Sequence, residues 1–480
     1  MKKITIALLS LILTSARVAA QEPLVQTTPP TTICPAQLSG RIDAIASRPQ
    51  FNRSRWGIIV QTATSGTTLY SLDAERYFIP ASTLKLLTAA VALHELGPDY
   101  RIRTSVYSDR DGSIYIVGRG DPSLTVTQLQ DLAKQLKARG ITQINRLIAD
   151  DNYFRGSAVN PTWEWEDVQA GHGAPVNSLI LNRNAMDLMF WPQNVGEPLR
   201  VTWVNPEERK GWQIENNSIT VAPNGREFVE IGRDFFRPIV RVGGQLRAGS
   251  EPEPMYVAIA RPAENFLQRF KEVLEAEGIK VLQSSISASP PSSQLTELAV
   301  VESPPLSELI KELNQESDNV YAEALLKILG AKRQNSDALV AGLKEMEIAL
   351  SELGVNREGY DLSDGSGLSR HNLVSPKALV ETLRAMVNSP LARVYQNSLP
   401  SAAVSGTLKR RFANSSAREI VLAKTGTLSG VSGLAGYVFA PNFNEVITFA
   451  ILANQSNLSS GSLRRAIDEI VVLLAGLDNC

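Results

Sequence analysis

The chain has 480 residues, which is enough for two or three domains. Its 48 basic and 49 acidic residues nearly cancel and no basic tract occurs, which argues against a nucleic-acid or strongly anionic membrane partner. The histidines (His94, His172, His371) and the two cysteines show no metal-ligand spacing, so we expect no metal or other cofactor. A Ser-His-Asp triad is possible in principle, but the sequence contains no Gly-x-Ser-x-Gly motif, the nucleophile elbow on which the serine of such a triad often lies.

The first 20 residues are typical of a secretory signal peptide. Met1-Lys2-Lys3 precedes an apolar run from Ile4 to Leu13, and Val18-Ala19-Ala20 supplies small residues for cleavage after Ala20. The run is too short to span a bilayer, and no second long apolar stretch follows, so we expect no transmembrane anchor after cleavage. The protein is predicted to be secreted, with residues 21–34 as a flexible Thr/Pro-rich leader.

The two cysteines stand at opposite ends of the mature chain. In an exported protein, Cys34 and Cys480 are candidates for a disulfide, because domain termini often lie close together. The alternative is two unpaired terminal thiols.

Hydrophobic periodicity and turn residues predict the remaining elements in chain order. Helices are expected at 35–48, 126–139, 261–278, 306–313, 320–329 and 462–477. Strands are expected at 56–62 and 67–72, 101–108 and 113–117, 144–149, 199–203, 214–221, 420–428, 434–439 and 446–453. Residues 285–293 form a Ser/Pro-rich connection.

The stretch Pro80 to Ala90 predicts the first turns of a buried helix that ends at Gly97-Pro98. Ser82 and Lys85 share one face of that helix because three residues separate them. A serine hydroxyl becomes a good nucleophile when a neighbouring base takes its proton, and a lysine amine of lowered pKa can be that base. Ser-x-x-Lys occurs once in the chain. Alone it would also suit an ordinary core helix with a surface lysine.

Two partner motifs follow in a fixed order. Ser317-Asp318-Asn319 lies between the helices predicted at 306–313 and 320–329, and Lys424-Thr425-Gly426 lies on a predicted strand. Ser-x-x-Lys, Ser-Asp-Asn and Lys-Thr-Gly together are the signature of penicillin-binding proteins and class A β-lactamases. Three short motifs in order, each on a suitable element, indicate a serine acyl-enzyme.

The spacing of the motifs favours one family among the proteins that carry this signature. About 230 residues separate Lys85 from Ser317, and a β-rich stretch lies within that gap. This arrangement resembles the penicillin-binding protein 4 family, the D-alanyl-D-alanine carboxypeptidase/endopeptidases of peptidase family S13, over nearly the whole mature chain. Further matching text lies at 319–323, 364–369 and 424–428.

The resemblance implies an α/β (α+β) fold of the serine β-lactamase/penicillin-binding transpeptidase-like class, with an antiparallel sheet between helices. Residues 35–98 and 303–480 would form the catalytic domain. Residues 99–190 and 251–302 would form an inserted α/β domain, and residues 191–250 an inserted β-rich domain.

The resemblance also implies roles for five side chains. Ser82 attacks the carbonyl between two D-alanines, or the β-lactam carbonyl that mimics it, and neutral Lys85 accepts the serine proton. Protonated Lys424 helps to keep Lys85 neutral by like-charge repulsion. Ser317 bridges the two lysines and relays a proton to the leaving amine, and Asn319 offers its amide to the substrate backbone.

Strand geometry and the resemblance assign the substrate contacts. Thr425 and Thr427 share one face of their strand, where their hydroxyls can bind the terminal carboxylate of the substrate. Gly426 leaves room for a substrate that lies along the strand. The backbone N–H groups of Ser82 and Thr427 form the expected oxyanion hole.

A side-chain pocket for diaminopimelate occurs in some relatives and matches this chain by position. Its acid is Asp151 or Asp150, its arginine is Arg370, and its apolar residue is Leu428, where a methionine would be expected in a close relative. Adjacent carboxylates such as Asp150 and Asp151 more often mark a solvated turn or a helix cap.

The predicted function is that of a serine DD-carboxypeptidase/DD-endopeptidase. Its partners would be peptidoglycan stem peptides, with β-lactam antibiotics as covalent inhibitors. Two alternatives stay open at this stage, a β-lactamase or esterase on the same fold, and a β-lactam-sensing or wall-binding protein without turnover.

Overall fold

The computed structural model of the chain describes residues 32–209, 211–234, 236–289, 294–333 and 336–480. The predicted signal peptide (1–20) and all but the last residues of the predicted leader lie outside this range. Within it, no helix is both long enough and apolar enough to cross a membrane.

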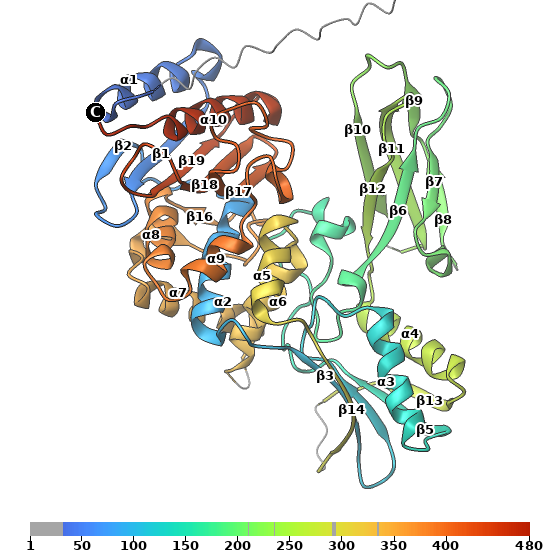
Figure 1. Cartoon of the computed structure of the whole chain (residues 1–480). Coiled ribbons are helices and arrows are strands. Elements are labelled where there is room, and N and C mark those ends of the chain that lie inside the picture. The colour runs from blue at the N-terminus through green and yellow to red at the C-terminus, as the bar shows by residue number, and fades with distance from the viewer. Residues whose placement is uncertain (1–31, 210, 235, 290–293, 334–335) are drawn as a thin grey trace, which may run out of the picture. The chain divides into compact units, whose positions relative to one another are not determined.

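A five-stranded antiparallel sheet joins the two ends of the chain (Figure 1). Its strands lie in the order β17 (Val421–Leu428), β18 (Val431–Val438), β19 (Ile447–Asn454), β1 (Arg55–Thr62) and β2 (Thr68–Leu72). The N-terminal hairpin therefore completes a C-terminal meander, because β1 pairs with β19 along its whole length. Every residue of β18 and β19 is buried, as expected for a sheet covered on both faces.

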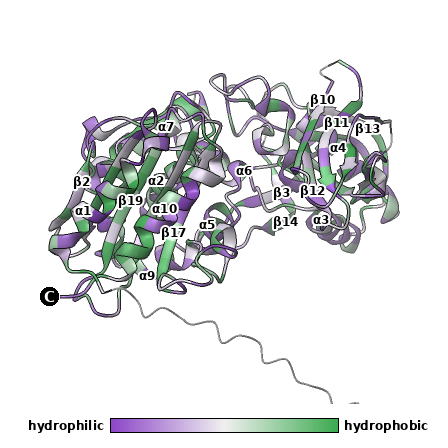
Figure 2. Cartoon of the chain, turned by 90° about the horizontal axis from the view of Figure 1, so that it is seen from above, coloured by the Kyte–Doolittle hydropathy of each residue, from purple (hydrophilic) through white to green (hydrophobic). Residues whose placement is uncertain are grey.

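The side-chain alternation of the strands builds one core on each face of this sheet. Ile58 and Val60 pack in the core that contains α1 (Pro35–Ala46) and α10 (Ser460–Ala475). Ile59 belongs to the opposite core, which is formed with the helices α2 (Lys85–Leu96), α5 (Leu306–Gln315), α6 (Asn319–Ala331), α7 (Ala338–Glu352), α8 (Pro376–Val387) and α9 (Ala392–Ser398). Figure 2 shows hydrophobic residues along these strands. The predicted antiparallel sheet between helices is present.

The region between α6 and β17 contains elements that the sequence pattern did not predict. The helices α7 and α8 begin at side-chain caps, because Asp337 and Ser375 each accept hydrogen bonds from backbone N–H groups of the first turn. The short strands β15 (Tyr360–Asp361) and β16 (Leu373–Val374) pair with each other and bracket the polar loop 363–370. Caps of this kind are visible in the sequence, and α8 also buries a face that contains Leu379, Leu383 and Met386 at helical spacing, so both signals for this helix were present.

A second sheet has the strand order β13 (Lys280–Ile286), β5 (Gln143–Asp150), β4 (Ile114–Val117), β3 (Arg103–Ser108) and β14 (Thr296–Glu302). The helices α3 (Val126–Ala138) and α4 (Pro262–Ala276) share one hydrophobic core with it. The strands β13 and β14 lie on either side of the predicted 285–293 connection and were not predicted themselves.

Two further sheets share a separate core and form the β-rich part. One contains β12 (Glu253–Ala258), β6 (Ala185–Trp191) and β7 (Arg200–Trp203). The other contains β10 (Phe228–Arg233), β11 (Ile239–Arg247), β8 (Gln213–Asn216) and β9 (Ile219–Val221). The predicted strand 214–221 is thus two strands, both parallel to β11. The shared core includes β6 and β12, which extend beyond the predicted range 191–250. The division of the chain into domains stays a prediction.

The segment 153–180 follows β5, a strand of the second sheet, in the chain and packs against the helices α2 and α6. Phe154, Val176 and Ile180 belong to the same hydrophobic core as α2 and α6. The Lys327 ammonium on α6 donates hydrogen bonds to the backbone carbonyls of Ser157 and Val176, at 2.8 and 2.7 Å. These contacts place part of the inserted chain beside the predicted catalytic residues.

The termini of the described chain are held together. Cys34 and Cys480 form a disulfide across 446 positions of sequence. Beside it, Ile33 and Leu477 form a parallel β-bridge, and both are buried in the core under α1 and α10. The bond therefore closes a loop that contains almost the entire described chain.

We predict that the double variant Cys34→Ser/Cys480→Ser loses about 2–5 kcal/mol of unfolding free energy, because the open chain gains conformational entropy when it unfolds. The denaturation midpoints of variant and wild type in urea would test this. The wild type in reductant should match the variant. Equal midpoints in all samples would show that the disulfide contributes nothing to stability.

Candidate active site

Ser82 lies in a tight turn that leads into a buried helix. A 3₁₀ turn at Ala81–Leu84 precedes α2, and Ala81 has a left-handed backbone with φ of +47°. Such a conformation is costly for a residue with a side chain, and it persists only where the surroundings hold it. The turn leaves Ser82 partly exposed, while Thr83, Leu84 and Lys85 are buried.

Lys85 is fully buried and has three polar neighbours. Its Nζ lies 3.0 Å from Ser82 Oγ, 2.6 Å from Asn319 Oδ1 and 2.7 Å from the Ser366 carbonyl oxygen. The amide and carbonyl oxygens only accept hydrogen bonds, so a neutral amine gives both of its hydrogens to them. Its lone pair is then left for the Ser82 hydroxyl, which is the arrangement that a general base requires.

Burial lowers the pKa of Lys85 to about 8, because the charged form loses its hydration. The carboxylates of Asp364, Asp318 and Glu323 oppose this effect. Desolvation, and not the expected repulsion by Lys424, is therefore the main reason that this amine can lose its proton near neutral pH.

Lys424 on β17 is the second fully buried lysine of the site. Its Nζ donates to Ser317 Oγ at 2.8 Å and to the Thr425 carbonyl at 3.1 Å. Burial lowers its pKa well below the usual value, and the charge of Lys85 lowers it further. The expected bridge of Ser317 between both lysines is wrong, because no hydrogen bond joins Ser317 to Lys85 within the described chain.

The Ser-Asp-Asn motif forms the start of α6. Ser317 has a left-handed backbone with φ of +62°, and Asp318 caps the helix by accepting from the N–H groups of Val320 and Tyr321. Asn319, in the first turn, accepts from Lys85 through Oδ1 and donates through Nδ2 to the His172 carbonyl at 2.8 Å. The amide predicted to bind the substrate backbone thus contacts the inserted segment in this structure.

The strand β17 is an edge strand, and its free edge begins at Lys-Thr-Gly. Near its start the edge is occupied, since Ala423 donates its N–H to the Pro400 carbonyl and Val421 accepts from Ala402. Alternation of hydrogen-bonding direction along an antiparallel strand places the N–H groups of Thr425 and Thr427 on that same edge. The Thr425 hydroxyl meets that of Thr407 at 2.9 Å, and Thr427 is exposed.

Two glycines allow the catalytic segments to approach the Ser82 turn. A Cβ on Gly426 would lie 2.7 Å from the Pro80 carbonyl oxygen, and one on Gly367 would lie 1.9 Å from that of Ala81. Gly367 also has φ of +81°, which disfavours residues with a side chain. The turn, β17 and the loop 363–370 therefore meet at a distance that only glycine permits.

The residues of the predicted diaminopimelate pocket lie in two groups. Arg370 donates to the carbonyl of Ser429, next to Leu428, at 3.1 Å, and its Nε pairs with Glu164 at 3.1 Å. Asp151 instead holds a loop of the inserted segment, because its Oδ1 accepts from the Asn177 side chain and from the N–H groups of Ser178 and Leu179. Burial raises the pKa of the Asp151 carboxyl. In the described chain, the carboxylate in contact with Arg370 is Glu164.

Sequence reasoning missed the contacts that involve backbone atoms or the inserted segment. The carbonyls of Ser366 and His172 have no side-chain signature, and Glu164 lies far from any motif. One signal was available, because Glu323 stands in the quoted 319–323 stretch and contacts the loop that carries Ser366.

The described chain holds one group of three side chains spaced for a metal ion, namely His94, Glu95 and Glu352. His94 and Glu352 already pair with each other at 3.3 Å, and Glu95 pairs with Lys332. Each of these side chains thus already has a partner, and none of these pairs includes a residue of the Ser82 site.

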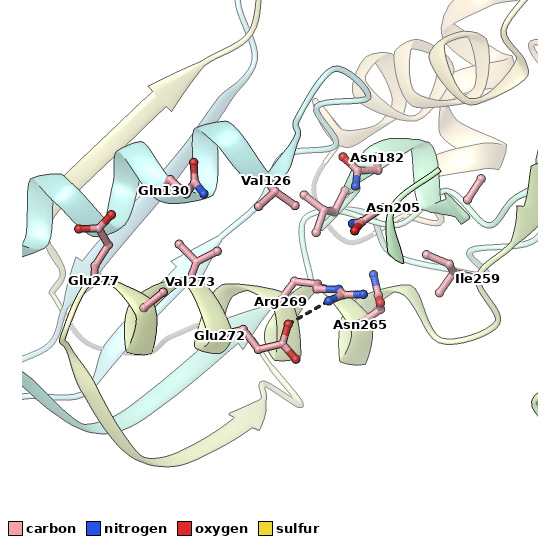
Figure 3. A pocket seen from close by; sticks show the side chains of 13 residues that line it. Val126, Gln130, Asn182, Asn205, Ile259, Asn265, Arg269, Glu272, Val273 and Glu277 are labelled. Carbon is pink, nitrogen blue, oxygen red and sulfur yellow. Dashed lines mark hydrogen bonds and ion pairs between the residues drawn. The ribbon is translucent and has the colours of Figure 1, made fainter. Parts of the chain in front are cut away.

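A cavity of about 380 Å³ lies between α3 and α4, away from the three motifs (Figure 3). Amide side chains such as Asn182, Asn205 and Asn265 line it, and Arg269 pairs there with Glu272 at 3.0 Å. The residues that line this cavity include no serine, lysine, cysteine or histidine. The cavity therefore offers no hydroxyl, thiol or amine of the kind that the Ser82–Lys85 pair supplies.

The sequence matches a known family along nearly its whole length. Residues 38–477 match the model of the D-Ala-D-Ala carboxypeptidase 3 (S13) family. A D-alanyl-D-alanine carboxypeptidase from an Actinomadura strain is 33% identical, over 92% of this chain and 84% of its own. A penicillin-sensitive carboxypeptidase A from Dictyostelium discoideum is 30% identical, over 88% of this chain and 87% of its own.

The crystal structure of penicillin binding protein 4 from Haemophilus influenzae has the same fold. It superposes with a TM-score of 0.75 at 24% sequence identity, covering 90% of this chain and 98% of that one. The predicted fold class is therefore confirmed.

We predict that Gly367→Ala lowers the rate constant for labelling by a fluorescent penicillin by about 100-fold, because a displacement of about 1 Å at the Ser82 turn has that effect on a reaction. Gly140→Ala is the matched control, since Gly140 also has φ of +81° but has no atom within 4 Å of the added Cβ. The Gly140→Ala variant has a side chain in the same left-handed backbone conformation, but its Cβ meets no neighbouring atom. Equal loss in both variants would mean that strain alone, and not contact with the turn, explains the effect.

Proposed function

Because the chain belongs to the D-Ala-D-Ala carboxypeptidase 3 (S13) family, we propose that it hydrolyses the D-Ala-D-Ala stem peptides of peptidoglycan through an acyl-enzyme on Ser82. As a member of a peptidase family it is a hydrolase. The observation that carries the proposal is the position of the Lys85 nitrogen, which lies 3.0 Å from Ser82 Oγ and within 2.7 Å of two oxygens that only accept hydrogen bonds.

The first step forms a bond between Ser82 Oγ and the carbonyl carbon between the two D-alanines. Lys85 takes the hydroxyl proton as this bond forms. The carbonyl oxygen becomes an oxyanion, for which the N–H of Thr427 on the free edge of β17 and the N–H of Ser82 are the proposed donors.

The second step breaks the C–N bond and releases D-alanine. The leaving amine needs a proton, and Ser317 with its hydrogen-bonded Lys424 is the proposed donor pair. Water then hydrolyses the acyl-enzyme: its oxygen bonds to the carbonyl carbon, the bond from that carbon to Ser82 Oγ breaks, and Lys85 returns its proton to Ser82 Oγ. The proton that the water loses replaces the one that the Ser317–Lys424 pair gave to the leaving amine.

The free edge of β17 is the proposed binding place of the substrate. An extended peptide can add to an exposed strand edge through backbone hydrogen bonds. The hydroxyls of Thr425 and Thr427 would then bind the terminal carboxylate, and Gly426 would leave room for the peptide. The pocket of Asp151, Arg370 and Leu428 stays a prediction, with Glu164 as a further carboxylate beside the arginine.

The same acyl transfer would cleave D-Ala cross-links, so we include endopeptidase activity in the proposal. A peptidoglycan substrate requires export, which the predicted signal peptide at 1–20 and a periplasmic location would provide. We also propose covalent binding of β-lactams at Ser82, supported by the relative that is named a penicillin-sensitive carboxypeptidase.

We predict that Ser82→Ala abolishes both D-alanine release from a D-Ala-D-Ala pentapeptide and labelling by a fluorescent penicillin, with a loss of at least about 1,000-fold. Ser71→Ala, at an exposed serine of β2, should behave as wild type. The measurements are released D-alanine, muropeptide cleavage, and the labelled residue by mass spectrometry.

Rapid decay of the label without peptide turnover would favour a β-lactamase. A stable label without turnover would favour a sensor. An unlabelled wild type would refute the acyl-enzyme.

We predict that the acylation rate rises with pH through a midpoint near 8. Lys85 acts as a base only when deprotonated, and burial places its pKa at about 8, so the fraction of competent enzyme falls tenfold for each pH unit below that value. Stopped-flow labelling with a fluorescent penicillin between about pH 5.5 and 9 would measure this midpoint. A flat profile would contradict the assignment of Lys85 as the base.

A further inference from the structure

Glu323 is a fully buried carboxylate group that the proposed mechanism does not use. Its residue exposure is 2%, and it lies on α6. Its Oε1 accepts hydrogen bonds from the backbone N–H groups of Gly365 at 2.9 Å and Ser366 at 2.8 Å. A buried carboxylate is costly to keep, so these two contacts need a reason.

The position of Glu323 along its helix supplies that reason. Asn319, Glu323 and Lys327 are spaced four residues apart, so they form one polar stripe on a buried face of α6. Asn319 contacts Lys85, Glu323 contacts the loop, and Lys327 contacts the inserted segment. The helix α6 thus carries one acceptor of the Lys85 amine directly and holds the second through Glu323.

We propose that Glu323 is a positioning residue for the reaction, which fixes the Ser366 carbonyl relative to Asn319 so that the Lys85 lone pair is directed at Ser82. This inference rests on the proposed function of Ser82 and Lys85. Without Glu323, the N–H groups of Gly365 and Ser366 lose their acceptor, and the 2.7 Å contact between Ser366 and Lys85 loses its support.

The contact works in either protonation state of the carboxyl group. Burial raises the pKa of Glu323, the nearby charge of Asp364 raises it further, and the charge of Lys327 opposes both. Both N–H groups bind the same oxygen, so a proton on Oε2 leaves the hydrogen bonds intact. A glutamine can reproduce this acceptor, because its amide oxygen occupies an equivalent position.

Two variants separate positioning from a general structural role. Glu323→Gln keeps an acceptor for the two N–H groups, and Glu323→Leu removes it at similar size. We expect the leucine variant to lower the first-order acylation constant for a fluorescent penicillin by about 100-fold with an unchanged dissociation constant of the pre-covalent complex. The glutamine variant should recover the acylation constant to within about tenfold of wild type.

Asp121→Leu is the matched control. Asp121 is also a buried carboxylate that holds a loop, since its Oδ1 accepts from the N–H and hydroxyl of Ser123 at 2.9 and 2.6 Å. It has no contact with Lys85 or its partners in the described chain. Its substitution should lower the thermal midpoint to a similar degree but leave the acylation constant unchanged.

Each outcome bears on the proposal. Leucine and glutamine variants with equal losses, or a leucine variant that acylates like wild type, would overturn it. So would an Asp121→Leu protein whose acylation constant falls in proportion to its stability. A wild type that is not labelled at Ser82 would instead refute the proposed function, and this result is visible in the same experiment.

Discussion

The chemistry that we propose for this protein depends on one buried amine and on the two oxygens that accept its hydrogens. Lys85 has no exposed surface, and two oxygens that cannot donate hydrogen bonds lie within 2.7 Å of its nitrogen. A neutral amine with both hydrogens so placed has only one direction left for its lone pair. That direction is Ser82, at 3.0 Å. Desolvation lowers the pKa of Lys85, so that the amine can be neutral near neutral pH. The two hydrogen bonds then leave its lone pair for the Ser82 hydroxyl.

This arrangement requires several distant segments to meet within a few ångströms. The Ser82 turn, the start of α6, the loop 363–370 and the edge of β17 each supply a part. The first hairpin of the chain pairs with the last strand of the sheet, so the sheet closes only when both ends of the chain are present. The disulfide between Cys34 and Cys480 reinforces the same closure.

The close approach of these segments is associated with unusual backbone conformations. Ala81, directly before Ser82, and Ser317, in the second motif, both have left-handed backbones. Positions of this kind are tolerated where packing and hydrogen bonds over-determine them. The inserted segment adds to that constraint, because the His172 carbonyl fixes the amide of Asn319 from the opposite side.

The sequence by itself determined which side chains are the candidates for the proposed chemistry. Ser82, Lys85, Ser317, Asn319 and Lys424 were found from the types and order of three motifs, since each element of the chemistry needs a particular functional group. The five strands of the central sheet and most helices were also predicted, because alternation and helical periods are local properties of the sequence. Among the missed helices, α9 has only 7 residues, too few to show a clear period, whereas α7 and α8 begin at side-chain caps that are visible in the sequence.

Only the tertiary structure decided how these groups are connected. Backbone carbonyls such as those of Ser366 and His172 are the same in every residue, so no sequence pattern marks the two that hold Lys85 and Asn319. The pairing of Ser317 with Lys424 alone, and of Arg370 with Glu164, depends on distances between segments far apart in the chain. Burial, which lowers the pKa of Lys85, is likewise a property of the folded protein and not of any one stretch of sequence.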